Sequence, residues 1–495
     1  MYEPTLKEFL KLARHGNVIP VYKEINADLD TPVSAYLKMK KSGYAFLLES
    51  VEGQEKIARF SFLGSDPSLV ISSKGRNVKI IRPHNNRIER FVATGSPLDE
   101  IKKIMRPFKS VHVKGLPRFY GGLVGFMGYD MVRFFEKLPD KNPNDLGIED
   151  SVFMLTDTML IFDHVNHTIK MLCNVFIPHN KVVSRKGLEI YYRKALNKIE
   201  SMHNDFQNTA VNLKETRIKE KASKVSSNFK KSEFEALVRR AKAYIKKGDI
   251  IQVVPSQRFK IKTKRNPFDI YRSLRSLNPS PYMYFLKLNY FYLAGASPEM
   301  LVRCENGLIQ TRPIAGTRPR GKNEEEDKKL ADELIKDKKE RAEHLMLVDL
   351  GRNDLGRVGR AGKVEVSEFM SIEKYSHVMH LVSEVRARLD NSRFDVYDVL
   401  KAAFPAGTVS GAPKIRAMEI IDELENVRRG PYAGCVGYFS FSHNMDTCIT
   451  IRTVLIKNNT AYIQAGGGIV ADSIPAKEYR ETVNKAKALI EAINN

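Results

Sequence analysis

The sequence predicts an α+β fold in which large antiparallel sheets are layered with helices. Short apolar runs bounded by turn residues follow one another in hairpin-like order in both halves of the chain. Helical patterns are grouped between these runs, whereas a doubly wound parallel sheet would alternate strands and helices regularly. With 495 residues and 42% hydrophobic content, the chain can also bury a large core.

Composition shifts divide the chain into two predicted lobes. Residues 1–200 are dominated by strand-like runs such as YAFLLES and TIKMLCNVF, so we expect a β-rich N-terminal lobe. Residues 201–231 are polar and charged, which predicts a linker. Residues 232–495 form the second predicted lobe. It opens with a helix that Ser232 caps and that ends at Gly248.

The charge and the cysteines exclude several classes of protein. The net charge is +23, but basic residues are scattered and interleaved with acids, as in KDKKERAEH. A solvated lysine-rich exterior therefore fits better than a nucleic-acid surface, and a diffuse positive field also attracts a dianionic metabolite. The four cysteines form no CxxC pair, which predicts a reducing cytosol without disulfides or structural zinc. No apolar window approaches about 18 residues, and the N-terminus lacks a signal sequence.

Two helical segments carry paired carboxylates. Glu340 and Glu343 lie three residues apart in a predicted helix over residues 336–354, and Glu478 and Glu481 repeat the spacing near the C-terminus. Side chains at this spacing project from one face of a helix. A single pair is usually solvated, but two pairs that meet would suit Mg²⁺, a hard ion that takes oxygen ligands.

Three glycine-containing stretches accompany these helices. Residues 404–414 (FPAGTVSGAPK) lie between helical patterns, where backbone amides and hydroxyls can cradle an anion, although an ordinary turn is the alternative. Residues 463–470 (IQAGGGIV) place three glycines after a strand, which allows close approach of the backbone to a ligand or forms a bulge. Residues 312–321 (RPIAGTRPRG) predict a third loop with arginines on both sides.

Together these stretches resemble the chorismate-utilising enzymes and, within that family, the first components of anthranilate synthases. The similarity covers residues 232–490 and reaches into the N-terminal lobe. The matching motifs, in chain order, are LLES (47–50), GDIIQVVPSQRF (248–259), NPSPYMYF (278–285), GASPEML (295–301), RPIAGTRPRG, ERAEHLMLVDLGRNDLGRV, HVMHLVSEV (377–385), FPAGTVSGAPK, RGPYAGCVGYFSF (429–441), AGGGIV and EYRETVNKA (478–486). The implied fold is that of this family, with an N-terminal regulatory lobe.

The resemblance also implies how the substrate, chorismate, and a metal ion are held. Mg²⁺ would bind Glu343 and Glu481 with support from Glu340 and Glu478, and would grip the ring carboxylate of chorismate. Tyr432 and Arg452 would hold the enolpyruvyl carboxylate, since the planar fork of arginine binds carboxylates bidentately. The remaining substrate-binding positions implied are Gly316, Thr317, Gly466, Gly467 and Gly468.

Candidate catalytic residues follow from the same match. Glu299 would protonate the departing C4 hydroxyl as ammonia attacks C2, which requires a raised pKa. His380 and Thr408 would lie against the ring, with His380 assisting pyruvate elimination, and Lys485 would lie near the ring carboxylate. Without the surrounding motifs, Glu299 would be interpreted as a surface acid and His380 as a packed core imidazole.

Two positions bear on the product. Gln252 stands where water-using relatives carry a lysine, which favours ammonia as the nucleophile. Ala315 stands where many aminodeoxychorismate synthases carry a lysine, which favours anthranilate with loss of pyruvate. Some aminodeoxychorismate synthases also lack that lysine, so their first component remains the alternative. A basic nucleic-acid-binding protein is the alternative from another class.

The resemblance implies an inhibitor and a protein partner. A tryptophan feedback pocket between the lobes would be lined by Glu49, Ser50, Pro281, Tyr282, Met283, Val436, Tyr438 and Cys448, for which ordinary inter-lobe packing is the alternative. No cysteine lies in a G-x-C-x-G nucleophile elbow. We therefore expect a cytoplasmic hetero-oligomer in which a separate glutamine amidotransferase subunit supplies ammonia, without nucleic acid or membrane.

Overall fold

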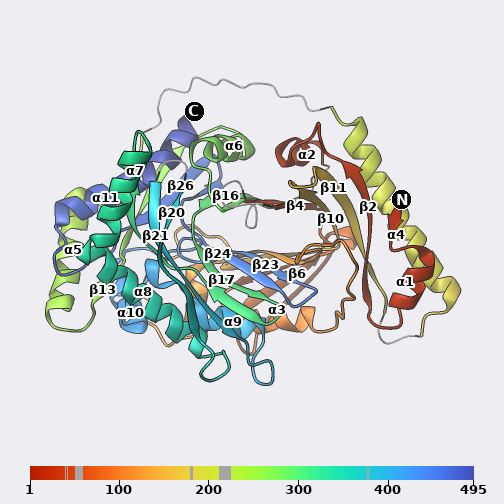
Figure 1. Cartoon of the computed structure of the whole chain (residues 1–495), viewed down its shortest axis with the longest axis horizontal. Coiled ribbons are helices and arrows are strands. Elements are labelled where there is room, and N and C mark those ends of the chain that lie inside the picture. The colour runs from red at the N-terminus through yellow and green to blue at the C-terminus, as the bar shows by residue number, and fades with distance from the viewer. Residues whose placement is uncertain (40, 42, 51–58, 179–181, 211–223, 376–377) are drawn as a thin grey trace.

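Two large sheets dominate the computed structural model (Figure 1). It describes residues 1–39, 41, 43–50, 59–178, 182–210, 224–375 and 378–495. Within these residues, every pairing between named strands is antiparallel. The predicted α+β class with antiparallel sheets is confirmed.

The first sheet, sheet A, runs from one side of the molecule to the other. Its strands, in spatial order, are β1 (Tyr2–Glu3), β2 (Val18–Asn26), β11 (Thr168–Phe176), β10 (Thr158–Asp163), β4 (Phe60–Ser65), β3 (Tyr44–Glu49), β15 (Tyr282–Leu288), β16 (Phe291–Ser297), β25 (Thr453–Lys457), β26 (Thr460–Gly466), β14 (Ser256–Lys262) and β12 (Ser226–Ser227).

The second sheet, sheet B, is stacked on the first. Its strands, in spatial order, are β19 (Ile314–Pro319), β21 (Val378–Arg388), β18 (Leu308–Thr311), β17 (Met300–Glu305), β24 (Met445–Ile449), β23 (Cys435–Ser440), β8 (Gly122–Met127), β9 (Ser151–Thr156), β5 (Leu69–Lys74), β6 (Asn77–Arg82) and β7 (Arg87–Val92), with β20 (Glu365–Lys374) also pairing with β21. A separate small ribbon joins β13 (Gln252–Val253) to β22 (Gly411–Ala412).

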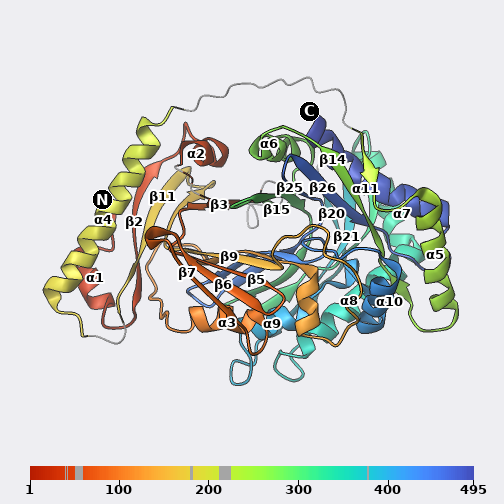
Figure 2. The same cartoon turned by 180° about the vertical axis from the view of Figure 1, so that it is seen from behind.

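Helices cover the outer surfaces and ends of the sheets (Figures 1 and 2). Near the N-terminus, α4 packs against β2 and β11, whereas α11 packs against β26, α5 and α6 at the opposite side. The helices are α1 (Leu6–Leu12), α2 (Pro32–Lys38), α3 (Pro97–Met105), α4 (Arg185–Asn208), α5 (Lys231–Lys246), α6 (Pro267–Leu277), α7 (Glu324–Lys336), α8 (Lys338–Gly356), α9 (Val396–Ala403), α10 (Lys414–Leu424) and α11 (Pro475–Asn494), with short 3₁₀ turns η1 (Pro83–Asn85), η2 (Tyr129–Phe134) and η3 (Gly407–Val409).

Both sheets contain strands from both predicted lobes. In sheet A, β3 of the N-terminal lobe pairs with β15, so that Leu47 lies opposite Phe285. In sheet B, β8 pairs with β23, so that Gly125 lies opposite Gly437. The sequence boundary at residue 200 therefore divides the chain but does not divide the sheets.

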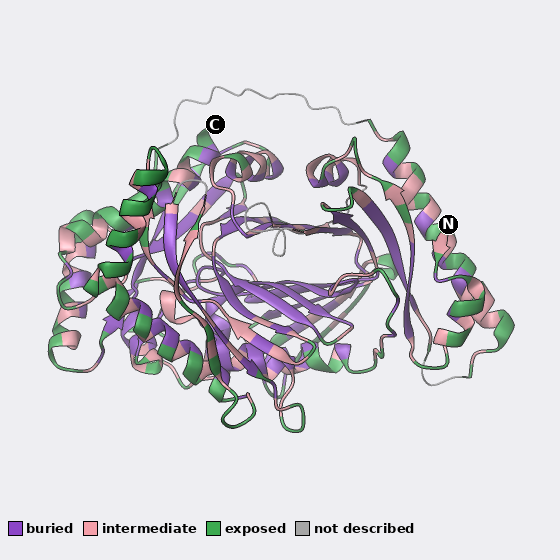
Figure 3. Cartoon of the chain, viewed as in Figure 1, coloured by how far each residue is buried: buried purple, intermediate pink, exposed green. Residues whose placement is uncertain are grey.

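The central strands of both sheets are largely buried (Figure 3). Apolar side chains pack between their facing sides. Phe126 of sheet B meets Phe291 of sheet A edge-to-face, with ring centroids 5.9 Å apart. Phe62 of sheet A likewise meets Tyr438 of sheet B at 6.3 Å. The outer side of sheet B is covered by α3 and α9, which bury residues such as Leu98. Removal of this apolar surface from water is the main force that holds the layers together.

Three local expectations differ from the structure. The helix α4 continues to Asn208, inside the stretch predicted as a linker, whose residues 211–223 lie outside the described residues. The helix α5 begins at Lys231, because the Glu233 carboxylate accepts the backbone N–H of Lys230 at 2.7 Å, so Ser232 is not the cap. The predicted loop 312–321 contains the strand β19, which bulges around Gly316.

Two further expectations concern membrane-spanning helices and disulfide bonds. In the part of the chain that the structure describes, the helices lack an apolar stretch of membrane-spanning length. The four cysteines are all free and buried, as expected for a chain without disulfides.

Candidate functional site

The glycine turn that follows β26 is the centre of the candidate site. A Cβ atom on Gly466 would lie 2.7 Å from the Tyr432 hydroxyl, and one on Gly468 would lie 2.5 Å from Gln252 Nε2. Contacts this short leave no room for a side chain, so only glycine fits. The turn thus brings bare backbone against two of the predicted site residues.

The two carboxylate pairs approach the same turn from opposite helices. On the α11 side, a Cβ atom on Gly467 would lie 3.4 Å from Glu478 Oε2 and 3.7 Å from Glu481 Oε1. On the α8 side, a Cβ atom on Gly468 would lie 3.7 Å from Glu343 Oε1. Acids from α8 and α11 therefore lie beside neighbouring residues of one turn.

The start of α8 explains the placement of its acids. Asp337 breaks the helical run after α7, and its side chain accepts the backbone N–H groups of Lys339 and Glu340. An aspartate that accepts these otherwise unpaired N–H groups is a strong N-cap. Glu340 and Glu343 consequently lie in the first two turns of α8, where the positive end of the helix dipole favours negative charge.

Most of these carboxylates also have protein partners. Glu343 accepts a hydrogen bond from Gln252 Nε2 at 2.9 Å, and Lys485 pairs with Glu481 at 2.7 Å. Glu340 lies 3.5 Å from Arg318. Among the described residues, no three acidic, histidine or cysteine side chains lie close enough together to form a ready-made metal site. Glu343, Glu478 and Glu481 therefore lie beside the turn, and Glu340 lies beside Gly316, without a closed coordination shell among the described residues.

The donor set nevertheless fits a hard divalent cation. Glu478 Oε2 is buried and has no hydrogen-bond partner among the described residues. Burial raises the pKa of both Glu340 and Glu478, and the second carboxylate of each pair adds to the rise. A divalent cation would offset this repulsion, and all the donors are oxygen atoms, which Mg²⁺ prefers.

Glu299 lies in the turn between β16 and β17, with 7% of its surface exposed. Burial raises its pKa to about 8, although Thr408, Arg452 and Lys485 all oppose the rise. The carboxyl group is therefore protonated at neutral pH and can donate a proton. The alternative of a surface acid is wrong, because the side chain is buried among other candidate site residues.

His380 on β21 lies beside the bulge of β19. Its Nδ1 atom is 2.9 Å from the carbonyl oxygen of Gly316 and 3.1 Å from the Thr317 hydroxyl. A carbonyl can only accept, so Nδ1 carries the proton. Burial lowers the pKa of His380, and the Arg452 charge lowers it further. The ring is thus a neutral imidazole whose Nε2 atom has a free lone pair.

The remaining substrate-site predictions lie around the same centre. Tyr432 is buried, and burial raises its pKa to about 12. Lys485 donates to the carbonyl of Gly466 at 3.1 Å. The positive charge of Arg452 lowers the pKa of both Glu299 and His380, so it lies near both groups. Thr408 lies in η3, close enough to lower the pKa of Glu299.

The predicted tryptophan-pocket residues come from strands of both sheets. Glu49 ends β3 opposite Met283 of β15, and Val436 of β23 lies opposite Cys448 of β24. The Tyr282 hydroxyl donates to Asp446 of β24 at 3.1 Å. Tyr282 thus faces sheet B, whereas Glu49 and Met283 lie on the opposite face of sheet A, against α6. Other members of the set, Ser50, Pro281 and Tyr438, belong to the same segments.

The Glu49 carboxylate already has partners within the protein. Its carboxylate is buried, accepts the Tyr271 hydroxyl at 2.5 Å and pairs with Arg275 at 3.1 Å. The ammonium group of a bound tryptophan would therefore join an existing ion pair. The Ser50 hydroxyl is buried with no hydrogen-bond partner among the described residues, so it has a free bonding position.

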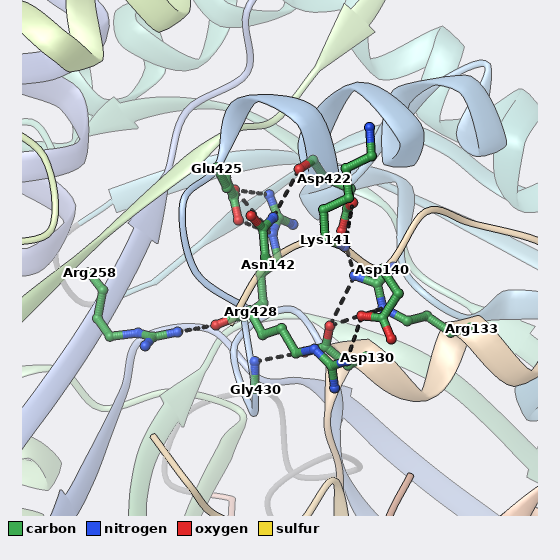
Figure 4. Close-up of polar contacts among 11 residues, drawn as sticks. Asp130, Arg133, Asp140, Lys141, Asn142, Arg258, Asp422, Glu425, Arg428 and Gly430 are labelled. Carbon is green, nitrogen blue, oxygen red and sulfur yellow. Dashed lines mark hydrogen bonds and ion pairs between the residues drawn. The ribbon is translucent and has the colours of Figure 1, made fainter. Parts of the chain in front are cut away.

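A buried polar network behind the site was missing from the sequence predictions. Arg429 pairs with Glu425 at 2.6 Å, and both side chains are almost fully buried. Figure 4 shows Glu425 beside a network in which Arg258 donates to the carbonyl of Arg428 and Gly430 donates to Asp130. In the sequence, this network is marked only by the RGPYAG motif, of which Tyr432 was the only residue predicted to lie in the site.

Known proteins that are similar to this chain in sequence belong to one family. The family model described as chorismate binding enzyme matches residues 43–491. Anthranilate synthase component 1 of Aquifex aeolicus is 50% identical over 491 residues, covering 99% of this chain and 97% of the relative. The same-named protein of Acetivibrio thermocellus is 48% identical over 498 residues, covering 100% of this chain and 99% of the relative.

A solved structure agrees with the sequence relatives. The crystal structure of anthranilate synthase component I from Streptococcus pneumoniae TIGR4 superposes with a TM-score of 0.75 at 38% identity. The match covers 94% of this chain and 99% of that chain. Together with the acids, the glycine turn and the protonated Glu299, these similarities lead to one conclusion: the chain belongs to the family of chorismate-binding enzymes.

Proposed function

We propose that this chain is the chorismate-converting component of an anthranilate synthase, which aminates chorismate with ammonia and eliminates pyruvate in the first step of tryptophan biosynthesis. One observation carries the proposal beyond family membership. A buried carboxylic acid, Glu299, lies in the same site as two pairs of acids that meet at a glycine turn. This arrangement can both hold a substrate carboxylate through a cation and protonate a leaving group.

The proposed binding mode uses charge complementarity. Glu340, Glu343, Glu478 and Glu481 would hold Mg²⁺, which supplies positive charge for the ring carboxylate of chorismate. Backbone amides of the turn at Gly466–Gly468 and the Lys485 ammonium lie beside that position. Tyr432 and Arg452 would orient the enolpyruvyl carboxylate, and Gly316 and Thr317 would line the ring.

The proton transfers follow from the protonation states. Glu299 would donate its proton to the departing C4 hydroxyl, which leaves as water while ammonia attacks C2. The neutral ring of His380, with its lone pair on Nε2, is suited to accept a proton in the later elimination of pyruvate. Thr408 would lie against the ring.

The side chain of Gln252 bears on whether ammonia or water attacks the ring. Its side chain is buried and donates to Glu343, so it offers no basic group that could activate water. The Oε1 atom of Gln252 has no hydrogen-bond partner among the described residues, and it can accept a hydrogen bond from ammonia. These features favour amination over hydration of the ring.

The chain must obtain ammonia from elsewhere. All four cysteines are buried, and burial raises the thiol pKa of Cys173 and Cys435 to about 12 and that of Cys304 to about 11. Burial also raises the pKa of Cys448. Such thiols are not glutaminase nucleophiles. A separate glutamine amidotransferase subunit would therefore supply ammonia in a cytoplasmic hetero-oligomer.

Feedback inhibition by tryptophan is the proposed regulation. The candidate pocket would lie where β15 approaches β24, with a free bonding position at Ser50 among the described residues and apolar side chains from Val436 and Cys448 on sheet B. Because strands of both sheets continue to the catalytic side, tryptophan would act by preferring an arrangement of the sheets that disfavours chorismate.

The product distinguishes this proposal from its main rival. Purified protein incubated with chorismate, Mg²⁺ and ammonium salt at high pH should form anthranilate and pyruvate in equal amounts. Aminodeoxychorismate without pyruvate would instead identify the chain as the first component of an aminodeoxychorismate synthase. Salt-sensitive binding to DNA or RNA without chorismate turnover would support the basic nucleic-acid-binding class.

The metal assignment predicts the effect of Glu343→Gln. Loss of one carboxylate charge should lower kcat/KM at fixed Mg²⁺ by about 100-fold, because transition-state charge loses its counter-ion. Asp349→Asn, a change at an exposed position on the same helix, should leave kcat/KM unchanged. Steady-state kinetics over a Mg²⁺ series, with circular dichroism to verify folding, make the comparison. Full activity of Glu343→Gln would refute the assignment.

Glu299→Gln tests the general acid. The amide cannot donate the required proton, so kcat should fall by about 100-fold or more. In the wild type, kcat measured at constant free ammonia should fall as the pH rises through about 8, where Glu299 loses its proton. A pH-independent wild-type kcat would contradict this role.

The same group should affect stability with a definite sign. The folded pKa of Glu299 is raised, so its contribution to stability is complete below the ordinary pKa of 4.5 and is lost as the pH rises through about 8. Glu299→Gln should remove this loss. Thermal unfolding between about pH 4 and pH 9, a range that brackets both values, measures the difference between the two proteins.

Ser50→Phe tests the regulatory pocket. A bulky ring should fill the space beside the free Ser50 hydroxyl and abolish inhibition by tryptophan, while turnover without inhibitor stays close to that of the wild type. Inhibition curves for tryptophan, with phenylalanine as the control ligand, check the expectation. Unchanged sensitivity to tryptophan would place the pocket elsewhere.

A further inference from the structure

Arg429 occupies a position where one side chain contacts several site segments. It follows the end of α10 and has 2% of its surface exposed. Its guanidinium group donates to both oxygens of Glu425, to the carbonyl of Val254 at 2.6 Å and to the carbonyl of Val409 at 2.7 Å. Each nitrogen therefore has a named acceptor in a different part of the chain.

Each of these acceptors is close in sequence to a candidate site residue. Val254 lies two residues after Gln252, and Val409 directly follows Thr408. The guanidinium carbon also lies 5.5 Å from the ring centroid of Tyr432, a cation–π distance. Arg429 thus connects the segment that would meet the nucleophile, the segment beside Glu299 and the ring that would hold the enolpyruvyl carboxylate.

Glu425 extends the same network to the glycine turn. Its Oε1 atom accepts the backbone N–H and the hydroxyl of Ser256, both at 2.8 Å. Ser256 is the register partner of Gly466 in the pairing of β14 with β26. The Arg429–Glu425 pair therefore lies behind four segments of the candidate site and makes no contact that requires it to reach the substrate.

Stability alone is a weak explanation for such a pair. Burying two charges is costly, and uncharged side chains of similar volume often replace a buried ion pair with little loss of stability. What uncharged side chains cannot replace are the N–H groups that bind Val254 and Val409. Lysine cannot replace them either, because only the planar fork of arginine presents donors in several fixed directions.

We propose that Arg429 is a positioning residue that holds the Gln252, Thr408 and Tyr432 segments in register around the reacting ring. This inference rests on the proposed function, since it assigns those segments to one reaction. The acids that hold the ring carboxylate come from α8 and α11, which Arg429 does not contact. Loss of Arg429 should therefore lower kcat much more than it raises the KM for chorismate.

The decisive experiment compares Arg429→Met with the double variant Glu425→Gln/Arg429→Met. The single variant leaves a buried carboxylate unpaired and should lower Tm strongly. The double variant removes that charge, and its amide oxygen can still accept from Ser256, so Tm should recover. We expect its kcat to stay about 100-fold below the wild type, with the KM for chorismate within about threefold. Recovery of kcat together with Tm would overturn the proposal.

Arg258→Lys and Arg429→Lys form a matched pair that remains informative if the methionine variants do not fold. Arg258 is also buried, pairs with Asp145 and donates to the carbonyl of Arg428 (Figure 4) and to Gln464 Oε1. Among the described residues, no hydrogen bond or ion pair joins its side chain to the Gln252, Thr408 or Tyr432 segments. Both changes should lower Tm, whereas only Arg429→Lys should lower kcat by more than about tenfold. An equal loss of kcat in both variants would leave Arg429 with a structural role only.

The same assays separate failure of this inference from failure of the proposed function. If the wild-type protein forms no anthranilate from chorismate and ammonia, the proposed function fails, and the assignment of segments to one reaction fails with it. If the wild type forms anthranilate and the double variant does so at the same rate, only the positioning role is excluded.

Discussion

Close approach of the backbone at Gly466–Gly468 is the constraint on which the site depends. A side chain at Gly466 would collide with Tyr432, and one at Gly468 would collide with Gln252. Acids from helices far apart in the sequence lie beside Gly467 and Gly468 of the same short piece of main chain. The surrounding fold supplies the opposing surfaces: β14 pairs with β26 on one side, and the ribbon of β13 and β22 lies on another.

Burial sets the protonation states of the groups around that turn. Charged forms are costly in a region of low dielectric constant, so Glu299 is held as a neutral acid and His380 as a neutral base. Arg429 keeps its charge because Glu425 and two carbonyls surround it. The site thus combines neutral groups that exchange protons with fixed charges that orient the segments.

The shared sheets connect the candidate tryptophan pocket physically with the candidate catalytic site. Strands of the N-terminal half form one end of each sheet and join the strands of the second lobe in the middle, at the pairings of β3 with β15 and of β8 with β23. A change in the space between the layers would therefore also move strands of the second lobe. Tyr282 in that space binds Asp446, which also pairs with Arg303 of β17, the strand that follows Glu299. A ligand that altered these contacts would act on the site through packed, hydrogen-bonded elements.

The sequence by itself determined the class of fold, the antiparallel strands, both acid-bearing helices and the identity of nearly every candidate site residue. It could do so because helical spacing, turn chemistry and an ordered set of motifs are local properties of the chain. It misplaced the cap of α5 and interpreted β19 as a loop, since a glutamate at the third helical position and pairing with β21 decided those two cases.

Only the tertiary structure decided which groups are buried and what surrounds them. The raised pKa of Glu299, the neutral state of His380 and the contacts of Arg429 with Val254 and Val409 arise from residues tens to hundreds of positions away. Arg429 in particular is a polar residue in a loop motif, where sequence patterns favour solvent exposure. Its burial depends on carbonyls of Val254 and Val409, and a sequence does not reveal where such carbonyls meet.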